Sequence, residues 1–481
     1  MRNLTLLTDL YEITMAYGFY KHGKHEEETV FDLFFRQNEL ITYSIAAGLE
    51  QAVEYLRGWR FSDEDIAYLR GLNKFDEDFL EYLKNMRFTG SVYAVKEGEP
   101  VFPGEPILVV KAPLIQAQFA ETALLNIVNH QTLIASKSAK ICRAAGNTTV
   151  MEFGLRRAQG PDAGIYGARA AIIGGCKSTS NVLAGQCFGV PVSGTMAHSW
   201  VMGFESEYAA FRAYANAYPD DCLLLVDTYD TLRSGVPNAI KVFEELRANG
   251  RKPRGIRLDS GDFAYLSKKA RKMLDEAGFP DTVICASGDL DECSITSLLA
   301  QGAKIDLWGV GTKLITSSEM PALGGVYKLA ASFDQEGNET PRIKLSDNAA
   351  KITTPAFKNL YRLYDKTSGM AIADLITLRS EKIDEDEPLT IFHPVETWKK
   401  TKIKNFRAEP LLHTVIENGK LVYEFPKLEE LREYSKTRLA AFWEEYLRLD
   451  MPQTYRVDLS EKLHALKGHM IDEIRAGNAR E

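Results

Sequence analysis

Short apolar runs recur through the middle of the chain, and each is followed by polar residues and then by a segment with helical periodicity. This alternation predicts parallel βα units. The expected strands cover 149–153, 190–192, 223–226, 255–258, 283–286 and 305–308, and the clearest helices cover 234–248, 263–277 and 291–300. About six strands are fewer than a closed eight-stranded barrel needs. The pattern therefore favours an irregular, incomplete α/β barrel, with an open doubly wound sheet as the alternative.

The N-terminal part has a different pattern. Leu7, Leu10, Thr14 and Tyr17 lie at helical spacing within 5–20, and Asp9 followed by Glu12 resembles a capping box that starts a helix. In 88–112, short β-rich runs alternate with Gly-Glu-Pro and Pro-Gly turns, which predicts a small strand-rich unit. A helical stretch follows over 116–145.

The regular alternation ends near residue 330. Beyond it lie a basic stretch, 398–407, and a charged amphipathic segment, 428–449, that predicts a single helix. We therefore expect three parts: an N-terminal α/β domain over 1–140, the incomplete barrel with the active site over 141–360, and a C-terminal extension over 361–481 that packs on the first two.

Composition narrows the class of protein. A chain of 481 residues, 45% hydrophobic and 26% charged, is typical of a soluble globular protein with two or three domains. No apolar run approaches the ~20 residues that span a bilayer, and the acidic N-terminus lacks a cleavage site, so we expect a cytoplasmic protein and no membrane partner. The six cysteines form no CxxC pair, which disfavours a zinc knuckle, and the net charge of −8 disfavours nucleic-acid binding.

Polar, glycine-containing motifs follow the expected strands directly. In chain order they are EFGLRRAQG (152–160), SGTMAHSW (193–200), DTYDTLRSG (227–235), RLDSGD (257–262), SGDLDE (287–292) and GVGTKL (309–314). The carboxyl ends of parallel strands lie on one face, and that face carries the active site of α/β proteins. The six motifs are therefore expected to converge.

Each motif alone has a simpler explanation. GVGT can be an ordinary turn, Ser260 or Asp262 can cap a helix, and His198 can be structural. Together they offer arginines and backbone N–H groups for phosphates or carboxylates, and aspartates for ribose hydroxyls or Mg²⁺. The chain has no GxSxG elbow after a strand, no GxxxxGK[ST] loop and no GxGxxG opening a helix, which disfavours α/β-hydrolases, P-loop enzymes and dinucleotide-binding proteins.

A set of motifs between residue 5 and about residue 355 closely resembles the nicotinate phosphoribosyltransferase family. The motifs are LLTDLYEITM, MEFGLRRAQGPDAG, SGTMAHSWV, VDTYDT, GIRLDSGD, DLWGVGT and KLSDNAAKITTP. The resemblance implies an N-terminal, hammerhead-like α/β domain and an irregular barrel of the type II phosphoribosyltransferase kind. It also implies a homodimer with shared active sites, in which the partner's N-terminal domain covers the barrel mouth.

The activity implied by the resemblance is that of an ATP-coupled ligase, the first step of NAD synthesis from nicotinate. Nicotinate, phosphoribosyl pyrophosphate (PRPP), ATP and water would give nicotinate mononucleotide (NaMN), pyrophosphate, ADP and phosphate through a phosphohistidine. The family's phosphorylated histidine matches His198, its nicotinate contacts match Tyr11, Thr195 and Arg257, and a PRPP contact matches Thr312.

The residues themselves suggest further roles. Phe153 could stack on the pyridine ring opposite Tyr11, and Asp227 could orient His198 during catalysis. For PRPP and its phosphates we assign a set of arginine, acid, hydroxyl and glycine positions: Arg156, Asp259, Ser287, Gly288, Gly309, Gly311 and Thr312. Mg²⁺ is expected with ATP and PRPP, with Asp289 or Asp259 as candidate ligands, and no tightly bound organic cofactor is expected.

Other functions remain as alternatives. Nicotinamide phosphoribosyltransferases place an acid near the amide, in a stretch that aligns with 178–181, where this chain has none. Quinolinate phosphoribosyltransferase would need more basic residues for two carboxylates and has no phosphorylated histidine. A non-catalytic relative that acts as a binding module would keep the fold without the activity. A barrel lyase is disfavoured because no lysine of catalytic type follows a strand.

Overall fold

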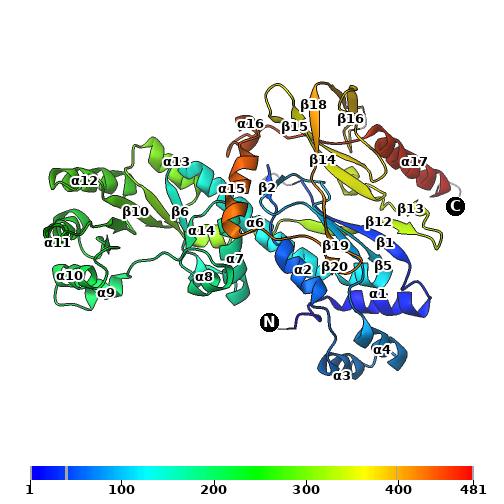
Figure 1. Cartoon of the computed structure of the whole chain (residues 1–481), viewed down its shortest axis with the longest axis horizontal. Helices are drawn as coiled ribbons and strands as arrows, with labels where there is room; N and C mark the ends of the chain where they lie inside the picture. The colour runs from blue at the N-terminus through cyan, green and yellow to red at the C-terminus, as the bar shows by residue number, and fades with distance from the viewer. Residues whose placement is uncertain (1–2, 38–41, 397, 479–481) are drawn as a thin grey trace. The chain divides into compact units, whose positions relative to one another are not determined.

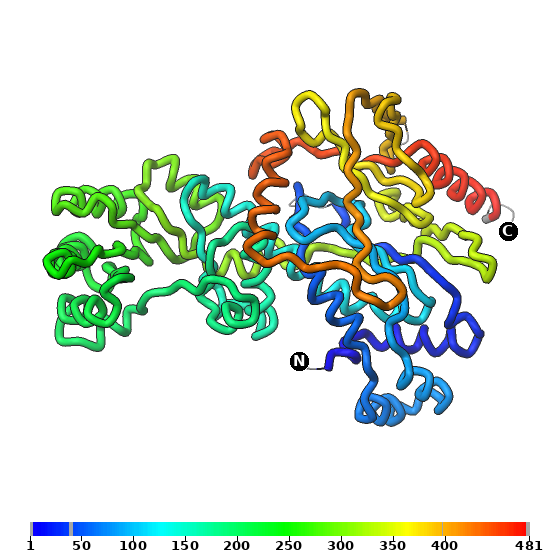
Figure 2. The backbone as a smooth tube through the Cα atoms, viewed as in Figure 1, coloured from blue at the N-terminus to red at the C-terminus, as the bar shows by residue number. Residues whose placement is uncertain are grey.

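The computed structural model describes residues 3–37, 42–396 and 398–478. The chain forms two compact units (Figure 1). The first unit comprises Met1–Thr132, Ala322–Lys427 and Tyr434–Glu481, and the second comprises Leu133–Pro321 and Leu428–Glu433. The backbone trace in Figure 2 can be followed from the first unit into the second and back. In the described part of the chain, no helix is long and apolar enough to cross a membrane.

The second unit is built on a parallel sheet of six strands in the order β7-β6-β11-β10-β9-β8. Its strands are β6 (Thr149–Glu152), β7 (Ser178–Thr179), β8 (Leu223–Leu225), β9 (Gly255–Leu258), β10 (Val283–Gly288) and β11 (Leu307–Val310). Among the described residues β7 and β8 are the free edges, so the sheet does not close. The predicted α/β class with an incomplete barrel is confirmed.

One predicted strand of this sheet is wrong. Residues 190–192 form no strand, and Val192 contributes only an isolated parallel bridge to Thr179. The place beside β6 is taken instead by the two-residue strand β7, which lies in a stretch without an apolar run. Pro191 has no N–H to give to a ladder, which limits how far pairing can extend there.

Helices follow the strands as the periodicity predicted. They are α7 (Pro161–Ile173), α8 (Val182–Phe188), α9 (His198–Met202), α10 (Glu207–Ala217), α11 (Val236–Ala248), α12 (Phe263–Glu276), α13 (Glu292–Ala300) and α14 (Thr312–Ile315), with short turns η1 (Leu155–Arg157) and η2 (Thr231–Gly235). Side-chain caps fix two of the starts, because Asp262 accepts from the N–H of Tyr265 at 2.9 Å and Asp291 accepts from that of Ser294 at 2.7 Å.

Apolar side chains between the sheet and helices α10–α12 form the main core of the second unit. Val226, just after β8, and Ile256 and Leu258 of β9 belong to one cluster with Phe211 and Phe243, and all five are buried. Gly235 is required at the start of α11, since a Cβ there would lie 1.9 Å from the carbonyl oxygen of Val226. This close approach holds the loop after β8 against the end of its strand.

The first unit contains two larger sheets. The seven-stranded sheet has the order β13 (Glu339–Pro341), β12 (Gly325–Phe333), β1 (Glu28–Phe35), β5 (Leu108–Pro113), β3 (Ser91–Ala94), β19 (His413–Glu417), β20 (Lys420–Leu421). The six-stranded sheet has the order β17 (Lys400–Ile403), β16 (Leu389–Phe392), β21 (Val457–Leu459), β15 (Ala371–Leu378), β14 (Lys358–Asp365), β18 (Phe406–Pro410). The strand-rich unit predicted over 88–112 is confirmed by β3, β5 and β4 (Pro100–Val101), which pairs with β2 (Ser44–Ile45).

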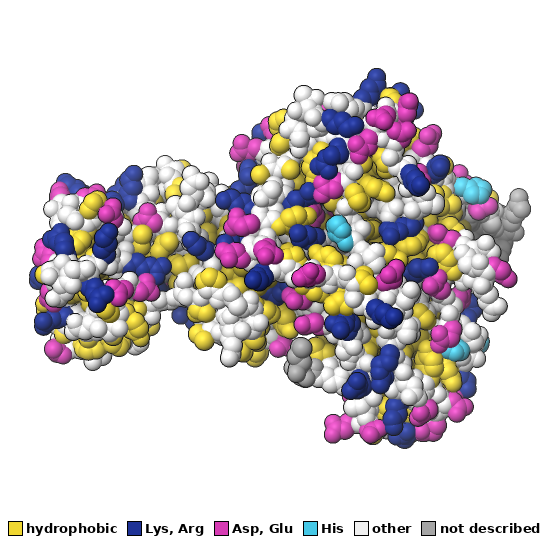
Figure 3. Space-filling view, in the orientation of Figure 1, with side chains coloured by type: hydrophobic (Ala, Val, Ile, Leu, Met, Phe, Trp, Pro, Cys, Tyr) yellow, Lys and Arg dark blue, Asp and Glu magenta, His cyan; other side chains and the backbone are white. Residues whose placement is uncertain are grey.

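The remaining elements of the first unit are mostly helical. They are α1 (Leu10–Lys21), α2 (Leu49–Arg57), α3 (Asp63–Gly71), α4 (Glu77–Asn85), α5 (Leu114–Phe119), α17 (Glu461–Asn478) and the turn η3 (Ala349–Lys351). Helix α6 (Glu121–Ala145) completes the helical stretch predicted over 116–145. On the face shown in Figure 3, basic and acidic side chains are interspersed, without the single basic area typical of nucleic-acid binding.

The first helix is confirmed, but its predicted capping box is wrong. Asp9 makes no cap bond and instead accepts from the hydroxyl of Thr122 at 3.0 Å. Glu12 is buried, where its carboxylate accepts from the amide of Gln118 at 2.7 Å, and burial raises its pKa to about 7. The buried face of α1 is Glu12, Ile13 and Ala16, whereas Leu10 is 50% exposed. Hydrogen bonds with Gln118 and Thr122, rather than local capping, therefore determine which face of α1 is buried in its unit.

The predicted helix over 428–449 is interrupted. It forms α15 (Leu428–Leu439) and α16 (Glu444–Leu447), and the backbone is extended at Trp443. Phe442 is buried between the two helices, with its ring 5.4 Å from that of Phe102 and 5.1 Å from that of Tyr455. Burial of this aromatic ring outweighs continued helical periodicity.

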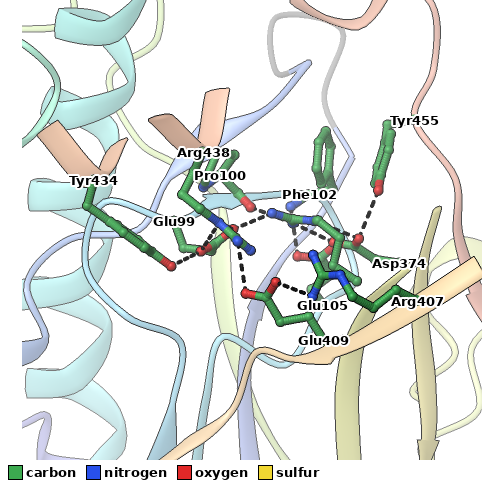
Figure 4. A network of polar contacts seen from close by, with 11 residues as sticks. Glu99, Pro100, Phe102, Glu105, Asp374, Arg407, Glu409, Tyr434, Arg438 and Tyr455 are labelled. Atoms are coloured by element: carbon green, nitrogen blue, oxygen red, sulfur yellow. Dashed lines mark hydrogen bonds and ion pairs between the residues drawn. The ribbon is translucent and has the colours of Figure 1, made fainter. Parts of the chain in front are cut away.

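A buried network of charged and phenolic side chains lies in the first unit (Figure 4). At its centre the fully buried Arg362 donates to both carboxylate oxygens of Asp374, at 2.9 and 2.6 Å, and also to Glu99. Tyr455 donates to Asp374 at 2.9 Å, and Arg438 donates to Glu99 at 2.9 Å. The network ties the turn around residue 100 to β14, β15 and α15.

Glu105 at the edge of this network leads to a test of stability against pH. Its carboxyl is fully buried and accepts from the N–H of Phe102 at 3.0 Å. Burial raises its pKa well above the usual range, and the carboxylate of Asp374 raises it further. The folded chain therefore keeps this proton at pH values where the unfolded chain, with a pKa of about 4.3, has lost it. The resulting contribution to stability is complete at low pH and is lost as pH rises.

Glu105→Gln should remove this pH dependence, since glutamine stays neutral and can still accept from Phe102. Relative to wild type, the free energy of unfolding of the variant should rise by up to about 1.4 kcal/mol per pH unit between about pH 5 and pH 7. Urea unfolding of both proteins across that range measures the difference, in which other titrating groups cancel. Parallel pH profiles of the two proteins would contradict the prediction.

Candidate active site

The carboxyl ends of the six parallel strands bring several predicted motifs to one edge of the sheet. In the ladder, Arg257 on β9 lies opposite Cys285, Ser287 on β10 lies opposite Gly309, and Val310 on β11 lies opposite Glu152. The segments after β8, β9, β10, β11 and β6 therefore begin on neighbouring strands. The predicted convergence of these motifs on one face of the second unit is confirmed.

His198 and Asp227 meet at this edge. The Nε2 atom of His198, the first residue of α9, lies 3.3 Å from Oδ1 of Asp227. The side chain of Asp227 is 2% exposed, and its second oxygen accepts from the N–H of Asp259 at 3.0 Å and from the hydroxyl of Ser260 at 2.6 Å. Because these bonds hold the carboxylate, it can fix the orientation of the imidazole, whose side chain is 40% exposed.

Arg257 is held at the centre of the edge by four contacts. Its Nε donates to the hydroxyl of Ser287 at 2.7 Å, and one terminal nitrogen donates to the hydroxyl of Thr195 at 3.0 Å and to the carbonyl of Met196 at 3.1 Å. The other terminal nitrogen donates to Asp259 at 2.7 Å. The guanidinium thus joins β9, β10 and the segment that leads to His198.

Asp259 carries a negative charge beside Arg257. Burial alone would raise the pKa of Asp259, but hydrogen bonds from Ser287 and Arg257 outweigh it and leave the pKa below its usual value. The ionised carboxylate therefore competes for the guanidinium with any carboxylate ligand. A ligand that takes two N–H groups of Arg257 must displace some of the bonds described above.

Phe153 and the glycine-rich turn after β11 lie directly against each other. A Cβ on Gly309 would be 2.6 Å from the ring of Phe153, and one on Gly311 would be 3.2 Å from the Phe153 carbonyl oxygen. Gly309 is within β11, whereas Gly311 and Thr312 start α14. Gly311 and Thr312 therefore lie beyond the end of the strand, whereas Gly309 does not.

The other predicted site positions have fewer contacts with His198, Asp227 and Arg257. Gly288 has a φ of +136° and a Cβ there would lie 3.1 Å from the carbonyl of Asp259, so glycine is needed. Arg156, on η1, and Asp289, after β10, are exposed. Tyr11 is 47% exposed and belongs to the first unit, so neither unit by itself brings it to the residues above.

Two residues of the site were missed or misassigned by the sequence reasoning. Ser260 appeared as a candidate helix cap, but Asp262 takes that role and Ser260 donates to Asp227. Glu152 is buried at the end of β6 and accepts from the hydroxyl of Thr179 at 2.5 Å and from the N–H of Gly154. A charged residue at the end of the apolar run TVME was the only local signal for it.

No cluster of three or more histidine, cysteine or acidic side chains suited to a metal ion occurs among the residues that the structure describes. Asp259 already bonds to Arg257 and Ser287, and Asp289 is an exposed acid just after β10. The acids of this edge do not by themselves form a metal cage.

Comparisons with known proteins cover nearly the whole chain. Profiles of the nicotinate phosphoribosyltransferase (NAPRTase) N-terminal domain, family and C-terminal domain match residues 6–129, 148–366 and 357–467. The nicotinate phosphoribosyltransferase of Bacillus subtilis (strain 168) is 50% identical over 98% of this chain and 96% of its own. That of Homo sapiens is 34% identical over 96% of this chain and 95% of its own.

Solved structures agree with the sequence comparisons. The crystal structure of human nicotinic acid phosphoribosyltransferase matches with a TM-score of 0.85 and 31% identity, covering 97% of this chain and 100% of that one. A nicotinate-nucleotide pyrophosphorylase from Pyrococcus furiosus, at 22% identity and a TM-score of 0.70 over 91% of this chain and 96% of its own, shares the fold. The identity over nearly the full length, the three matching profiles and the fold show that this chain belongs to the nicotinate phosphoribosyltransferase family.

Proposed function

We propose that this chain joins nicotinate to the ribose of PRPP, giving NaMN and pyrophosphate, with ATP hydrolysis coupled to the reaction. One observation carries the proposal within the family: a hydrogen-bonded His198–Asp227 pair and an Arg257 held by four contacts lie together at the carboxyl edge of one parallel sheet. The direct test is to quantify NaMN from nicotinate and PRPP, with and without ATP. Absence of NaMN under both conditions would favour a non-catalytic binding module.

Arg257 is the group we assign to the nicotinate carboxylate. Its planar guanidinium can present two parallel N–H donors to a carboxylate, which a lysine cannot do. Thr195, already bonded to Arg257 at 3.0 Å, would lie beside the same ligand, and the ring of Phe153 would provide an aromatic surface for the pyridine. Binding would exchange part of the contact with Asp259 for a contact with substrate.

The phosphates of PRPP are assigned to the neighbouring turns. The N–H groups of Gly311 and Thr312 and the exposed Arg156 offer donors, while Asp259, Ser287 and Gly288 border the same edge as Gly309. Because the C1–O bond breaks with positive charge developing on the ribose, positioning and charge stabilisation should contribute most to catalysis. Mg²⁺ would arrive with ATP and PRPP and neutralise their phosphates, with Asp259 or Asp289 as nearby acids.

A nicotinamide phosphoribosyltransferase is the second candidate, and the structure bears on it in one respect. Although 178–181 contains no acid, the carboxylate of Glu152 lies against this stretch. It is fully buried, and its two oxygens already accept hydrogen bonds from Thr179 and from Gly154, so it is not exposed to accept from a substrate amide. Together with Arg257, this favours a carboxylate substrate over an amide.

We also propose a homodimer that shares its active sites. Leu7, Leu10, Tyr11 and Met15 are each more than a third exposed, which leaves apolar side chains of the N-terminal segment and α1 facing solvent in the single chain. A second copy whose α1 covers the sheet edge would bury them and bring Tyr11 to the pyridine. The six cysteines are free thiols, as expected for the cytoplasmic location that we propose.

Mixing two impaired variants tests the shared site. Tyr11→Ala chains should be nearly inactive and His198→Ala chains should keep only the slow, ATP-independent rate. Exchanged mixtures should recover part of the ATP-stimulated wild-type rate, because a heterodimer has one site with neither substitution. NaMN formation before and after subunit exchange is the measurement. If mixtures that are shown by mass to contain heterodimers recover no activity, the sites are not shared. Tyr11 and His198 would then act in the same chain, or Tyr11 would serve only packing.

A further inference from the structure

Glu152 is a buried acid at the active edge to which the proposed reaction gives no role. It is the last residue of β6 and is fully buried. One carboxylate oxygen accepts from the N–H of Gly154, and the other accepts from the hydroxyl of Thr179 at 2.5 Å. Burial raises the pKa of this carboxyl, while the two hydrogen bonds oppose that rise. Leaving a buried carboxylate without hydrogen-bond donors is costly, so the folded chain should keep both hydrogen bonds.

The hydrogen bond from Gly154 to Glu152 also restricts Phe153, which lies between these two residues. The N–H of Phe153 donates to the carbonyl of Val310 at 2.8 Å, and its ring lies on Gly309 without room for a Cβ. Gly154 is equally confined, because a Cβ there would lie 2.5 Å from the side chain of Ile315. The turn 152–154 can therefore adopt few other conformations while the carboxylate bond to Gly154 persists.

Thr179 connects Glu152 to residues 193–198, the segment that ends at His198. Its hydroxyl, which donates to Glu152, accepts from the N–H of Asn181 at 2.9 Å. Its main chain donates to the carbonyl of Pro191 at 3.1 Å and accepts from the N–H of Ser193 at 2.9 Å. Ser193 begins the segment SGTMAH, which contains Thr195 and His198. One carboxylate thus connects the ring of Phe153 to the segment that carries the contact with Arg257.

We propose that Glu152 is a positioning residue for the pyridine substrate, acting through Phe153 on one side and through Thr179 and the 193–198 segment on the other. This inference rests on the proposed function. It places Glu152 behind the binding surface, without contact to the substrate. The expected result of weakening it is a much larger loss of nicotinate binding than of PRPP binding. The ring of Phe153 and Thr195 are assigned to nicotinate, whereas the turn after β11 is held to Phe153 by the main-chain bond to Val310, which does not involve the carboxylate.

A pair of substitutions at Thr179 tests the proposal without removing the buried charge. Thr179→Val has nearly the same shape but no hydroxyl, and leaves one oxygen of Glu152 unpaired, whereas Thr179→Ser keeps the donor. The KM for nicotinate should rise on the order of 10-fold in Thr179→Val and stay within about twofold of wild type in Thr179→Ser. The KM for PRPP should change by less than about twofold in both.

A matched control separates positioning from general loss of packing. Thr282 is a buried threonine in the same unit whose hydroxyl donates to the carbonyl of Phe279 at 2.8 Å, just before the amino end of β10. Thr282→Val should lower thermal stability without a selective change in the KM for nicotinate. Glu152→Asp, which keeps the charge but is too short to reach both donors, should reproduce the selective effect of Thr179→Val.

The outcomes are distinguishable from failure of the proposed function. If wild type makes no NaMN, the proposed function fails. If wild type is active but Thr179→Val and Thr179→Ser behave alike, or the KM values for nicotinate and PRPP rise together, the positioning role is wrong. If both Thr179→Val and Glu152→Asp fail to fold, Glu152 serves the fold and the positioning role is likewise overturned.

Discussion

His198→Asn should abolish both labelling of the protein by γ-phosphate-labelled ATP and all stimulation of the reaction by ATP, yet leave slow ATP-independent synthesis of NaMN. Imidazole is a good nucleophile for a phosphoryl group because it is largely neutral near pH 7 at its usual pKa of ~6.5. Asparagine is polar and of similar size but lacks a nucleophilic ring nitrogen. In the proposed scheme the histidine couples ATP to the reaction and does not itself break the C1–O bond.

The geometry also specifies which ring nitrogen should react. Nε2 of His198 lies 3.3 Å from Oδ1 of Asp227, so a proton held on Nε2 leaves Nδ1 as the nucleophile. The buried Asp227 then stabilises the positive charge that the ring gains as the phosphoryl group transfers. The added phosphate charge could recruit Mg²⁺ and order the loops around the pyrophosphate of PRPP. Hydrolysis of the phosphohistidine after NaMN forms would return the enzyme to its starting state.

His469→Asn is the matched control for this experiment. His469 is an exposed histidine of the first unit that pairs with Glu473 at 3.2 Å, so its replacement should leave labelling and ATP stimulation unchanged. Acid-labile phosphate, NaMN yield and the position of the phosphate on the ring are the three measurements. Acid-labile phosphate on His198→Asn, or a rate that still responds to ATP, would show that another residue is phosphorylated.

Arg257→Lys should lower kcat/KM for nicotinate by roughly 30- to 150-fold, the equivalent of about 2–3 kcal/mol for a lost charge-assisted bidentate contact. One ammonium group cannot reach Ser287, Thr195 and Asp259 together, as the guanidinium does at 2.7, 3.0 and 2.7 Å. The KM for PRPP should change far less. For the same reason, wild type should prefer nicotinate to nicotinamide by a similar factor, since the amide lacks the charge.

Arg254→Lys provides the control three residues earlier in the same segment. Arg254 is more than a third exposed and pairs with Asp221 at 2.5 Å, away from the carboxyl edge of the sheet. Its replacement should leave both substrates unaffected, because an exposed ion pair contributes little. The measurement is kcat/KM with nicotinate and with nicotinamide for wild type, Arg257→Lys and Arg254→Lys. Equal kcat/KM for the two substrates in wild type would refute the assignment of Arg257 to the carboxylate.

The sequence by itself determined the class of the second unit and the location of its chemistry. Apolar runs of three to five residues followed by amphipathic segments encode parallel βα units, because strand and helix have different periodicities. Parallel strands share one direction, so Asp227 after β8 and Arg257 near the end of β9 had to reach the same edge, whereas the strand predicted before the His198 motif does not form. The incomplete barrel could be anticipated for the same reason, since the runs are too few for closure.

Only the tertiary structure decided which of those residues bond to one another. The contacts of Asp227 with Ser260, of Arg257 with Thr195 and of Glu152 with Thr179 join residues 27 to 62 positions apart, and no local pattern encodes them. Burial also overrode local signals, as when Glu12 bonded to Gln118 instead of capping α1, and when Phe442 interrupted a helical pattern to pack against Phe102. Secondary structure can be predicted from local periodicity because it depends on residues that are neighbours in sequence. Buried polar contacts depend instead on which strands and helices pack together, so their partners come within reach only when the chain folds.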